Sequence, residues 1–115
     1  MKYKVHPYCE FLPKMTDAEF SDLAASMKSG GGNEVPAIAW GNEILDGRSR
    51  YEASEQEGTK FYAREWRPKS NDPIIQKIEA LDIIEKQNIL RRHLDAGQRA
   101  MTAALIKKER MRLVG

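Results

Sequence analysis

The most constraining stretch of this sequence is an apolar segment that stops at a glycine and continues as a helix. Val35 to Leu45 is rich in β-branched and apolar residues and is interrupted by Gly41-Asn42, which predicts two short strands joined by a hairpin-like turn. Asp46 is a candidate N-cap for the helix that follows, since its carboxylate can accept a hydrogen bond from an orphan backbone N–H. Gly47 allows the backbone to bend and to approach a partner closely. We therefore expect a strand-to-helix corner at Gly47, with a helix from there to about Glu57.

The first turn of this helix carries arginines next to backbone amides that have no acceptor within the helix. Arg48 and Arg50 flank Ser49 in that turn, where the helix dipole already favours an anion. Such a corner is suited to a phosphate or a carboxylate. The alternative is an ordinary corner with solvated arginines, because one glycine and two arginines make a weak motif.

A second motif changes the balance between these two interpretations. It runs from Gln87 to Met101 and reads Gln-Asn-Ile-Leu-Arg-Arg-His-Leu-Asp-Ala-Gly-Gln-Arg-Ala-Met. Together with the Leu45–Ala53 stretch, it resembles the paired motifs of the N-terminal domain of the ParB family, and more narrowly the ParB-like proteins of phages, plasmids and other mobile elements. The likeness extends from His6-Pro7 to about Leu105. It implies an α+β fold of the ParB/sulfiredoxin type, with a small mixed sheet flanked by helices and a helical C-terminal part.

The resemblance also implies a phosphate cradle built from both motifs, because in ParB proteins that bind CTP both motifs contact the triphosphate. The expected ligand is CTP, or another nucleoside triphosphate, with Mg²⁺. The candidate nucleotide- and phosphate-binding residues are Gly47, Arg48, Ser49, Arg50, Asn88 and Arg91. Arg48, Ser49 and Gln87 depart from the family's pattern, which leaves the handling of Mg²⁺ and hydrolysis open. An arginine suits phosphate because its planar fork makes bidentate, charge-assisted hydrogen bonds.

The net charge of the chain is only +2, but cations gather near its C-terminal end. Between Lys86 and Arg112, eight Lys or Arg residues stand against Asp95 and Glu109, which gives this part a net charge of +6 and leaves −4 for the remainder. This asymmetry predicts a surface for a polyanion, and DNA is the expected partner. The alternative is a well-solvated basic helix face. The candidate DNA-binding residues are Arg91, Arg92, His93, Arg99, Lys107 and Lys108.

Local signals place three further helices. Residues 16–19 have the pattern of a capping box and begin a helix that ends in the glycine run at 29–32. Asn71 or Asp72 can cap a second helix, with Pro73 at its first position and an end near Leu90. Asp95 and Gln98 form another box-like cap, from which the last helix runs from about Ala96 to Leu113. Its apolar residues share one face: Ala100, Met101, Ala104, Leu105 and Met111.

Two more strands are expected, one near Tyr3 and Val5 and one within residues 60–66. Residues 1–94 are interpreted as one ParB/sulfiredoxin-like domain. Residues 95–115 are interpreted as the start of a basic helical segment that is cut before a helix-turn-helix region. By the same resemblance, a homodimer is expected in the full-length context.

Composition narrows the class of protein. Hydrophobic residues make up 41% and charged residues 31% of the chain, which indicates a soluble globular protein. No apolar run approaches the roughly 20 residues that span a bilayer, so no membrane association is expected. The single Cys9 cannot form an internal disulfide, and the first residues lack the apolar region of a signal peptide. Both observations favour the cytoplasm.

Three functions compete at this point. The first is a ParB-type module in which a bound nucleotide biases a DNA-clamping dimer in plasmid or phage partition or in gene control, with NTPase (CTPase-like) activity left open. The second is an enzyme of the same fold, a nuclease or a small-molecule kinase; a nuclease would gather carboxylates for a metal ion, with Glu43, Asp46, Glu52 and Glu85 as candidates. The third is a DNA-binding module in which residues 91–112 contact phosphates and no nucleotide binds.

No catalytic residue is identified, and no metal site is predicted. His6 and Cys9 are close in sequence, but His93 is the only other histidine and there is no second cysteine. Sulfiredoxin places its catalytic cysteine directly after the glycine, where this chain has Arg48, so that chemistry is excluded. Tyr51 is interpreted as a packed ring rather than a base.

Overall fold

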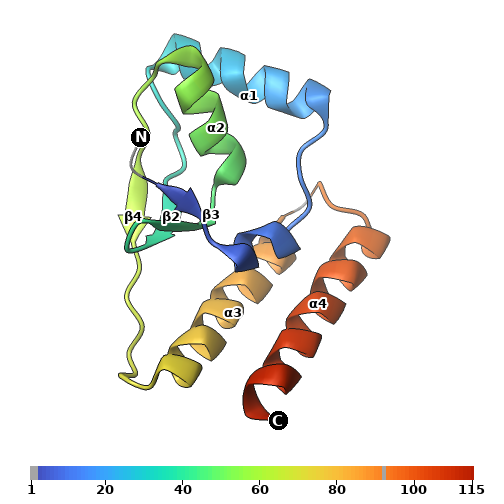
Figure 1. Cartoon of the computed structure of the whole chain (residues 1–115). Coiled ribbons are helices and arrows are strands. Elements are labelled where there is room, and N and C mark those ends of the chain that lie inside the picture. The colour runs from blue at the N-terminus through green and yellow to red at the C-terminus, as the bar shows by residue number, and fades with distance from the viewer. Residues whose placement is uncertain (1–2, 92) are drawn as a thin grey trace. The chain divides into compact units, whose positions relative to one another are not determined.

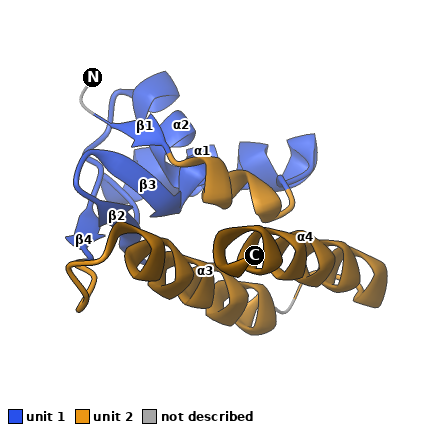
Figure 2. Cartoon of the chain, turned by 60° about the horizontal axis from the view of Figure 1, so that its bottom comes forward, with its two compact units in different colours: residues 1–5, 14–66 blue, residues 6–13, 67–115 orange. Residues whose placement is uncertain are grey.

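The computed structural model describes residues 3–91 and 93–115, and Arg92, one of the predicted DNA-binding residues, lies outside them. Within the described residues the chain is an α+β protein with four α-helices, one 3₁₀-helix and an open, mixed sheet of four strands (Figure 1). The α+β class predicted from the sequence is therefore confirmed. The chain divides into two compact units, residues 1–5 with 14–66 and residues 6–13 with 67–115 (Figure 2).

The first unit contains the whole sheet. Its strands are β1 (Lys4–Val5), β2 (Ala37–Trp40), β3 (Glu43–Asp46) and β4 (Ala63–Glu65), in the spatial order β1-β3-β2-β4. β2 and β3 form the expected antiparallel hairpin, whereas β1 pairs in parallel with β3 and β4 pairs in parallel with β2. The hairpin register shifts between Ile38 and Ala39, so that Ile38 pairs with Asp46 and Ala39 with Ile44. This irregularity lies where β3 ends and the next helix begins.

Two helices of the first unit, α1 (Asp17–Gly30) and α2 (Arg48–Glu57), pack on each other. Their contact is built from small and flexible apolar side chains: Ala24, Met27 and Ala53, with Phe20 and Leu23 packed against them. α2 ends at Glu57, as predicted, and Gly58 is its C-cap. Tyr51 of α2 is buried and makes edge-on contacts with the rings of Tyr3 and Phe61, which agrees with its interpretation as a packed ring.

The second unit is helical. It consists of a 3₁₀-helix, η1 (Pro7–Phe11), and two α-helices, α3 (Pro73–Leu90) and α4 (Ala96–Val114). α3 and α4 pack together, and η1 packs on both. The Thr102 hydroxyl donates to the Phe11 carbonyl over 2.6 Å, and the Tyr8 hydroxyl donates to Glu109 Oε2 over 2.6 Å. These two hydrogen bonds fix which side of α4 faces inward.

The apolar row that the sequence predicts on one face of α4 points away from this interior. Thr102 and Ile106 are the buried residues of the helix, whereas Met101, Leu105 and Met111 are 70%, 41% and 62% exposed. The reason is the docking of η1, whose contacts with α4 join residues far apart in the sequence. Helical periodicity groups the apolar residues on one face but does not tell which face is covered.

The predicted caps of three helices are confirmed. α1 and α4 begin with full capping boxes, formed by Thr16 with Glu19 and by Asp95 with Gln98. α3 begins at Asp72, whose carboxylate accepts from the amide of residue 74 over 2.9 Å. Each of these side chains satisfies a backbone donor in the first turn of its own helix.

The predicted cap of α2 is wrong. Its N-cap is Gly47, at φ +112°, a residue that has no side chain with which to cap the helix. Asp46 is instead the last residue of β3, where it is buried and pairs with Ile38 in the ladder. Because Asp46 belongs to the strand, the helix starts one residue later than the sequence suggested.

Candidate anion-binding corner

Gly47 joins β3 to α2 at a place where only glycine fits. A Cβ on this residue would lie 2.4 Å from Ala37 Cβ and 3.1 Å from Ala37 Cα, in the neighbouring strand β2. Its φ of +112° is also a conformation that other residues rarely adopt. The missing side chain therefore lets the start of α2 lie directly against β2.

The first turn of α2 follows a glycine N-cap, which offers no side-chain oxygen to the backbone amides of the turn. The Tyr51 amide donates to the Gly47 carbonyl over 3.0 Å, and the regular helical ladder begins with this bond. In an α-helix, the N–H groups that precede the first such bond have no acceptor within the helix. No acidic residue lies in this turn. The amides and the helix dipole together favour an anion at this position.

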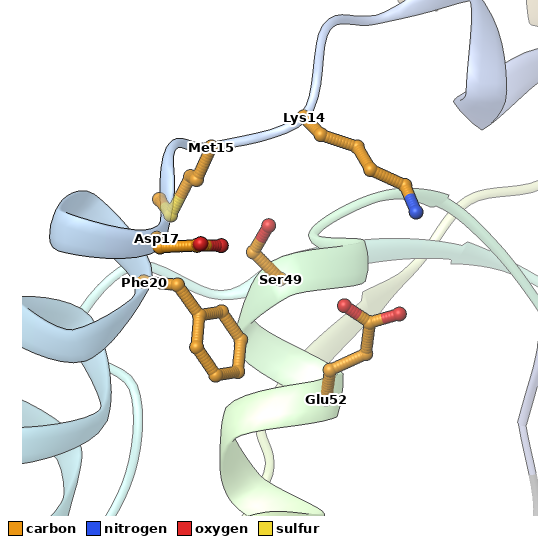
Figure 3. A pocket seen from close by; sticks show the side chains of 6 residues that line it. All are labelled: Lys14, Met15, Asp17, Phe20, Ser49 and Glu52. Carbon is orange, nitrogen blue, oxygen red and sulfur yellow. The ribbon is translucent and has the colours of Figure 1, made fainter.

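The three side chains of the first turn of α2 have different surroundings. Arg48 is buried, with 9% of its surface exposed. Ser49 lines a shallow pocket of about 220 Å³ (Figure 3). Arg50 is half-buried and lines a different pocket of about 170 Å³, and its Nη1 donates to the Pro36 carbonyl over 3.3 Å. The sequence-predicted group is thus adjacent in the fold, but its side chains do not share one cavity.

The Ser49 pocket has mixed charge. Figure 3 shows Ser49 and Glu52 on α2, Asp17 and Phe20 on α1, and Lys14 on the segment that leads into α1. One ammonium and two carboxylates around the pocket do not favour a second polyanion site there. Lys14 is a residue that the sequence reasoning missed, since no local pattern places it near Ser49.

The Arg50 pocket is lined by apolar side chains from α1, among them Leu23 and Met27, and by the loop before β2. Asn33 holds this loop: its Nδ2 donates to the carbonyls of Val35 and Tyr62, both over 2.8 Å, and its Oδ1 accepts from the Tyr62 amide over 2.9 Å. All the hydrogen-bonding atoms of this buried amide are therefore engaged in fixing the wall beside Arg50. The sequence reasoning also missed Asn33, whose role depends on a strand far along the chain.

The second motif of the expected cradle lies at the end of α3, in the other unit. Asn88 is buried, and its Nδ2 donates to the Arg99 carbonyl over 3.2 Å. Arg99 Nη2 in turn donates to the carbonyl of Arg91, the C-cap of α3, over 2.7 Å. Asn88 Oδ1 and Arg99 Nε are buried without a hydrogen-bond partner among the described residues. These side chains tie the end of α3 to the start of α4 within their own unit.

The remaining predicted DNA-binding residues differ in how accessible they are. Lys107 and Lys108 are exposed on α4, and His93 is exposed just before it. Arg99 is half-buried and engaged with the Arg91 carbonyl. The most exposed of the predicted DNA-binding residues, within the described part of the chain, are therefore Lys107, Lys108 and His93.

Two other cations of the basic C-terminal part are paired with carboxylates. Arg110 binds Asp82 over 2.6 Å and Glu85 over 3.0 Å, and these partners raise its pKa while Arg110 lowers the pKa of Glu85. Arg112 binds Glu109 over 2.6 Å. The net charge of +6 therefore overstates the positive surface that a partner would meet.

Glu109 is the most perturbed acid of this network. The hydrogen bond from Arg112, and after it the one from Tyr8, lower the pKa of Glu109 to about 2. Burial, and then the hydrogen bond to Glu109, raise the pKa of the Tyr8 hydroxyl. This arrangement fastens η1 to α4 and keeps the carboxylate charged, which indicates a structural rather than a catalytic role.

The described residues include no group of three or more His, Cys, Asp or Glu side chains placed to hold a metal ion. Of the carboxylates considered for a nuclease, Asp46 is buried at the end of β3 and Glu85 binds Arg110. Glu43 and Asp46 lie on β3 and Glu52 on α2 in the first unit, whereas Glu85 lies on α3 in the second.

In the part of the chain that the structure describes, no helix has the length and apolar character needed to cross a membrane.

Comparisons with known proteins identify no relative of this chain. No protein-family model matches it, and neither does any curated protein or any solved structure. A functional assignment therefore depends on the residues and their geometry.

Proposed function

We propose that this chain is a ParB-like nucleotide- and DNA-associated module whose Gly47 corner binds the phosphates of a nucleoside triphosphate. The observation that carries the proposal is the start of α2, where the N-cap is a glycine with no side chain of its own and no acid lies in the first turn. α1, α3 and α4 each fill the same position with a side-chain oxygen, from Thr16, Asp72 and Asp95. At α2 a phosphate oxygen takes the place of that missing cap.

The residues of the corner suit a phosphate chain. Gly47 permits close approach of the backbone, and the amides of Arg48, Ser49 and Arg50 are the donors. The Arg50 guanidinium supplies a bidentate partner, since its present bond to the Pro36 carbonyl, at 3.3 Å, uses one nitrogen at a long distance.

Several finer features belong to the same proposal and are supported by the sequence motifs. They are a fold of the ParB/sulfiredoxin type, CTP with Mg²⁺ as the ligand, a cytoplasmic location, and a homodimer that closes on DNA in plasmid or phage partition or gene control. The exposed Lys107, Lys108 and His93 support the DNA contact, because phosphate contacts need accessible cations and donors.

The test is calorimetric titration of CTP, ATP and GTP, each with Mg²⁺, into the whole chain and two variants. Arg50→Ala removes the proposed phosphate ligand. Arg64→Ala is the matched control, because Arg64 is an exposed arginine of β4 in the same unit. We expect saturable binding of one nucleotide that weakens roughly tenfold or more in Arg50→Ala and stays unchanged in Arg64→Ala. Equal affinity of the chain and Arg50→Ala would contradict the proposal.

A second candidate is a DNA-binding module without nucleotide. The observation in its favour is that Asn88 and Arg99 of the second motif donate hydrogen bonds to backbone carbonyls of their own unit, the carbonyls of Arg99 and Arg91. This candidate predicts DNA binding that weakens steeply with salt and does not respond to any nucleotide. Replacing Lys107 and Lys108 by Gln should lower the slope of log affinity against log salt by roughly 2, measured by fluorescence anisotropy of a labelled duplex.

A further inference from the structure

One face of α4 is apolar, exposed and uncovered in the described structure. Met101, Leu105 and Met111 are 70%, 41% and 62% exposed, and Ala104 between them is exposed as well. Large apolar side chains occur singly on most surfaces, but a row of them at helical spacing marks an interaction site more often. The sequence pattern identified this row, and neither the Gly47 corner nor the interior of the second unit uses it.

The charge on the same face has one sign. Lys107 and Lys108 are exposed beside the apolar row, and α4 contains a single acidic residue, Glu109. The Glu109 side chain is only 14% exposed, and its carboxylate is engaged with Tyr8 and Arg112. We define the outer α4 face as Met101, Ala104, Leu105, Lys107, Lys108 and Met111.

The chemistry of the outer α4 face argues against three simple occupants. The proposed DNA contact uses Lys107 and Lys108 but does not cover the methionines and Leu105, because phosphates and sugars offer them no apolar partner. A second copy of the chain would bring the like charges of Lys107 and Lys108 together. A helix that lies in a membrane interface typically carries Trp, Phe or Leu on its apolar side, whereas α4 has no aromatic residue.

We propose that the outer α4 face docks an acidic amphipathic helix of a partner protein. Met101, Ala104 and Leu105 stand at i, i+3 and i+4, and Met111 follows Ala104 by seven residues, which is the spacing with which one helix packs along another. Ala104 leaves room for close approach, and the flexible side chains of Met101 and Met111 can adapt to the partner's apolar residues. Carboxylates beside the partner's apolar stripe pair with Lys107 and Lys108, and this charge complementarity selects an acidic partner over a basic one.

The probe for this proposal is a labelled synthetic peptide of about 20 residues, with Leu at the a and d positions of a heptad and Glu at e and g. Two control peptides are a scrambled sequence of the same composition and the same design with Lys in place of Glu. Fluorescence anisotropy measures their binding to the whole chain at physiological salt. We expect saturable binding of the acidic amphipathic peptide and much weaker binding of both controls.

Variants of the chain separate the apolar from the charged contribution to peptide binding. Met101→Ser with Met111→Ser, and Lys107→Gln with Lys108→Gln, should each weaken binding of the acidic peptide roughly tenfold. The matched controls are Val35→Ser and Lys28→Gln, which change an exposed apolar residue and an exposed cation in the other unit. Circular dichroism melts of all variants check that these surface changes leave the fold intact.

Three outcomes would overturn the proposal. Equal binding of the acidic and scrambled peptides would show that helical amphipathicity is not recognised. Self-association of the chain in sedimentation that Met101→Ser with Met111→Ser removes, without peptide binding, would assign the face to a second copy. Binding of anionic phosphatidylserine vesicles without peptide binding would assign it to a membrane surface.

Discussion

The two motifs of the expected cradle are built in opposite ways. The Gly47 corner is fixed by the backbone: the close approach to Ala37 and the positive φ determine the turn, and the N-cap has no side chain. The end of α3 is fixed by side chains: Asn88 bonds to the Arg99 carbonyl and Arg99 bonds to the Arg91 carbonyl. One motif leaves donors for a ligand, and the other uses its donors to hold two helices together.

Two motifs that both contain arginines can therefore differ in whether their hydrogen-bond donors are available to a ligand. Both contain arginines near a helix end, and the family resemblance implied that both contribute to one phosphate cradle. Because a helix start presents N–H groups and a helix end presents C=O groups, only the first kind of end attracts an anion through its backbone. We therefore expect changes at α2 to affect ligands, except at Gly47 itself, and changes at the end of α3 to affect stability.

The largest effect is expected for Gly47→Ala. Strain at positive φ and the clash with Ala37 together should lower the free energy of unfolding by about 2–5 kcal/mol, measured by denaturant titration. Gly41→Ala is the matched control, because Gly41 also has a positive φ, +62°, but has nothing within 4 Å of its Cβ position. A similar loss in both variants would show that conformational strain, and not the approach to Ala37, dominates the corner.

A smaller effect is expected for Asn88→Ala. Loss of the bond to the Arg99 carbonyl and of a buried side chain should lower the free energy of unfolding by about 1–3 kcal/mol. Arg50→Ala, in the other motif, should change it by only about 0.5 kcal/mol or less, since Arg50 makes one long bond at a half-buried site. If Arg50→Ala destabilised the chain as much as Asn88→Ala, the contrast between the two motifs would fail.

A further effect concerns the hydrogen bonds that join η1 to α4 and depends on pH. Because the pKa of Glu109 is lowered from 4.5 to about 2, its charged form stabilises the folded chain above pH 4.5, and this contribution is lost as the pH falls toward 2. The difference in unfolding midpoint between the chain and Glu109→Gln should therefore shrink over this window. Tyr8→Phe removes one of the two hydrogen-bond donors of Glu109 and should cost about 1 kcal/mol at neutral pH.

Glu34→Gln is the control for the pH experiment, because Glu34 is an exposed carboxylate of the other unit. Its difference from the parent chain should not follow the same curve. A difference between the parent chain and Glu109→Gln that stays constant from neutral pH down to pH 2 would contradict the assigned role of Glu109.

Local patterns predicted much of the fold. The caps at Thr16, Asp72 and Asp95 and the hairpin around residues 41–42 are interactions between near neighbours, so the sequence displays both partners at once. The cap of α2 was predicted wrongly because Asp46 is the last residue of β3 and pairs with Ile38 across the hairpin. A register shift in a ladder is not visible in the spacing of one strand.

The candidate site was predicted in part. Gly47 and the first turn of α2 follow from a local strand-glycine-helix pattern. The pocket around Ser49 with Lys14, and the loop that Asn33 holds beside Arg50, depend on contacts between segments distant in sequence. The outward direction of the apolar face of α4 depends likewise on η1, which binds Thr102 and Glu109 from the opposite end of the chain.

The central claim, that the start of α2 is the phosphate site, is tested most directly by amide nuclear magnetic resonance. The ¹⁵N-labelled chain is titrated with CTP and Mg²⁺, and in parallel with cytidine, which lacks the phosphates. We predict that CTP shifts the amide resonances of Arg48, Ser49 and Arg50 most strongly and that cytidine leaves them in place. Unshifted amides at these three positions under saturating CTP, or equal shifts with cytidine, would contradict the account.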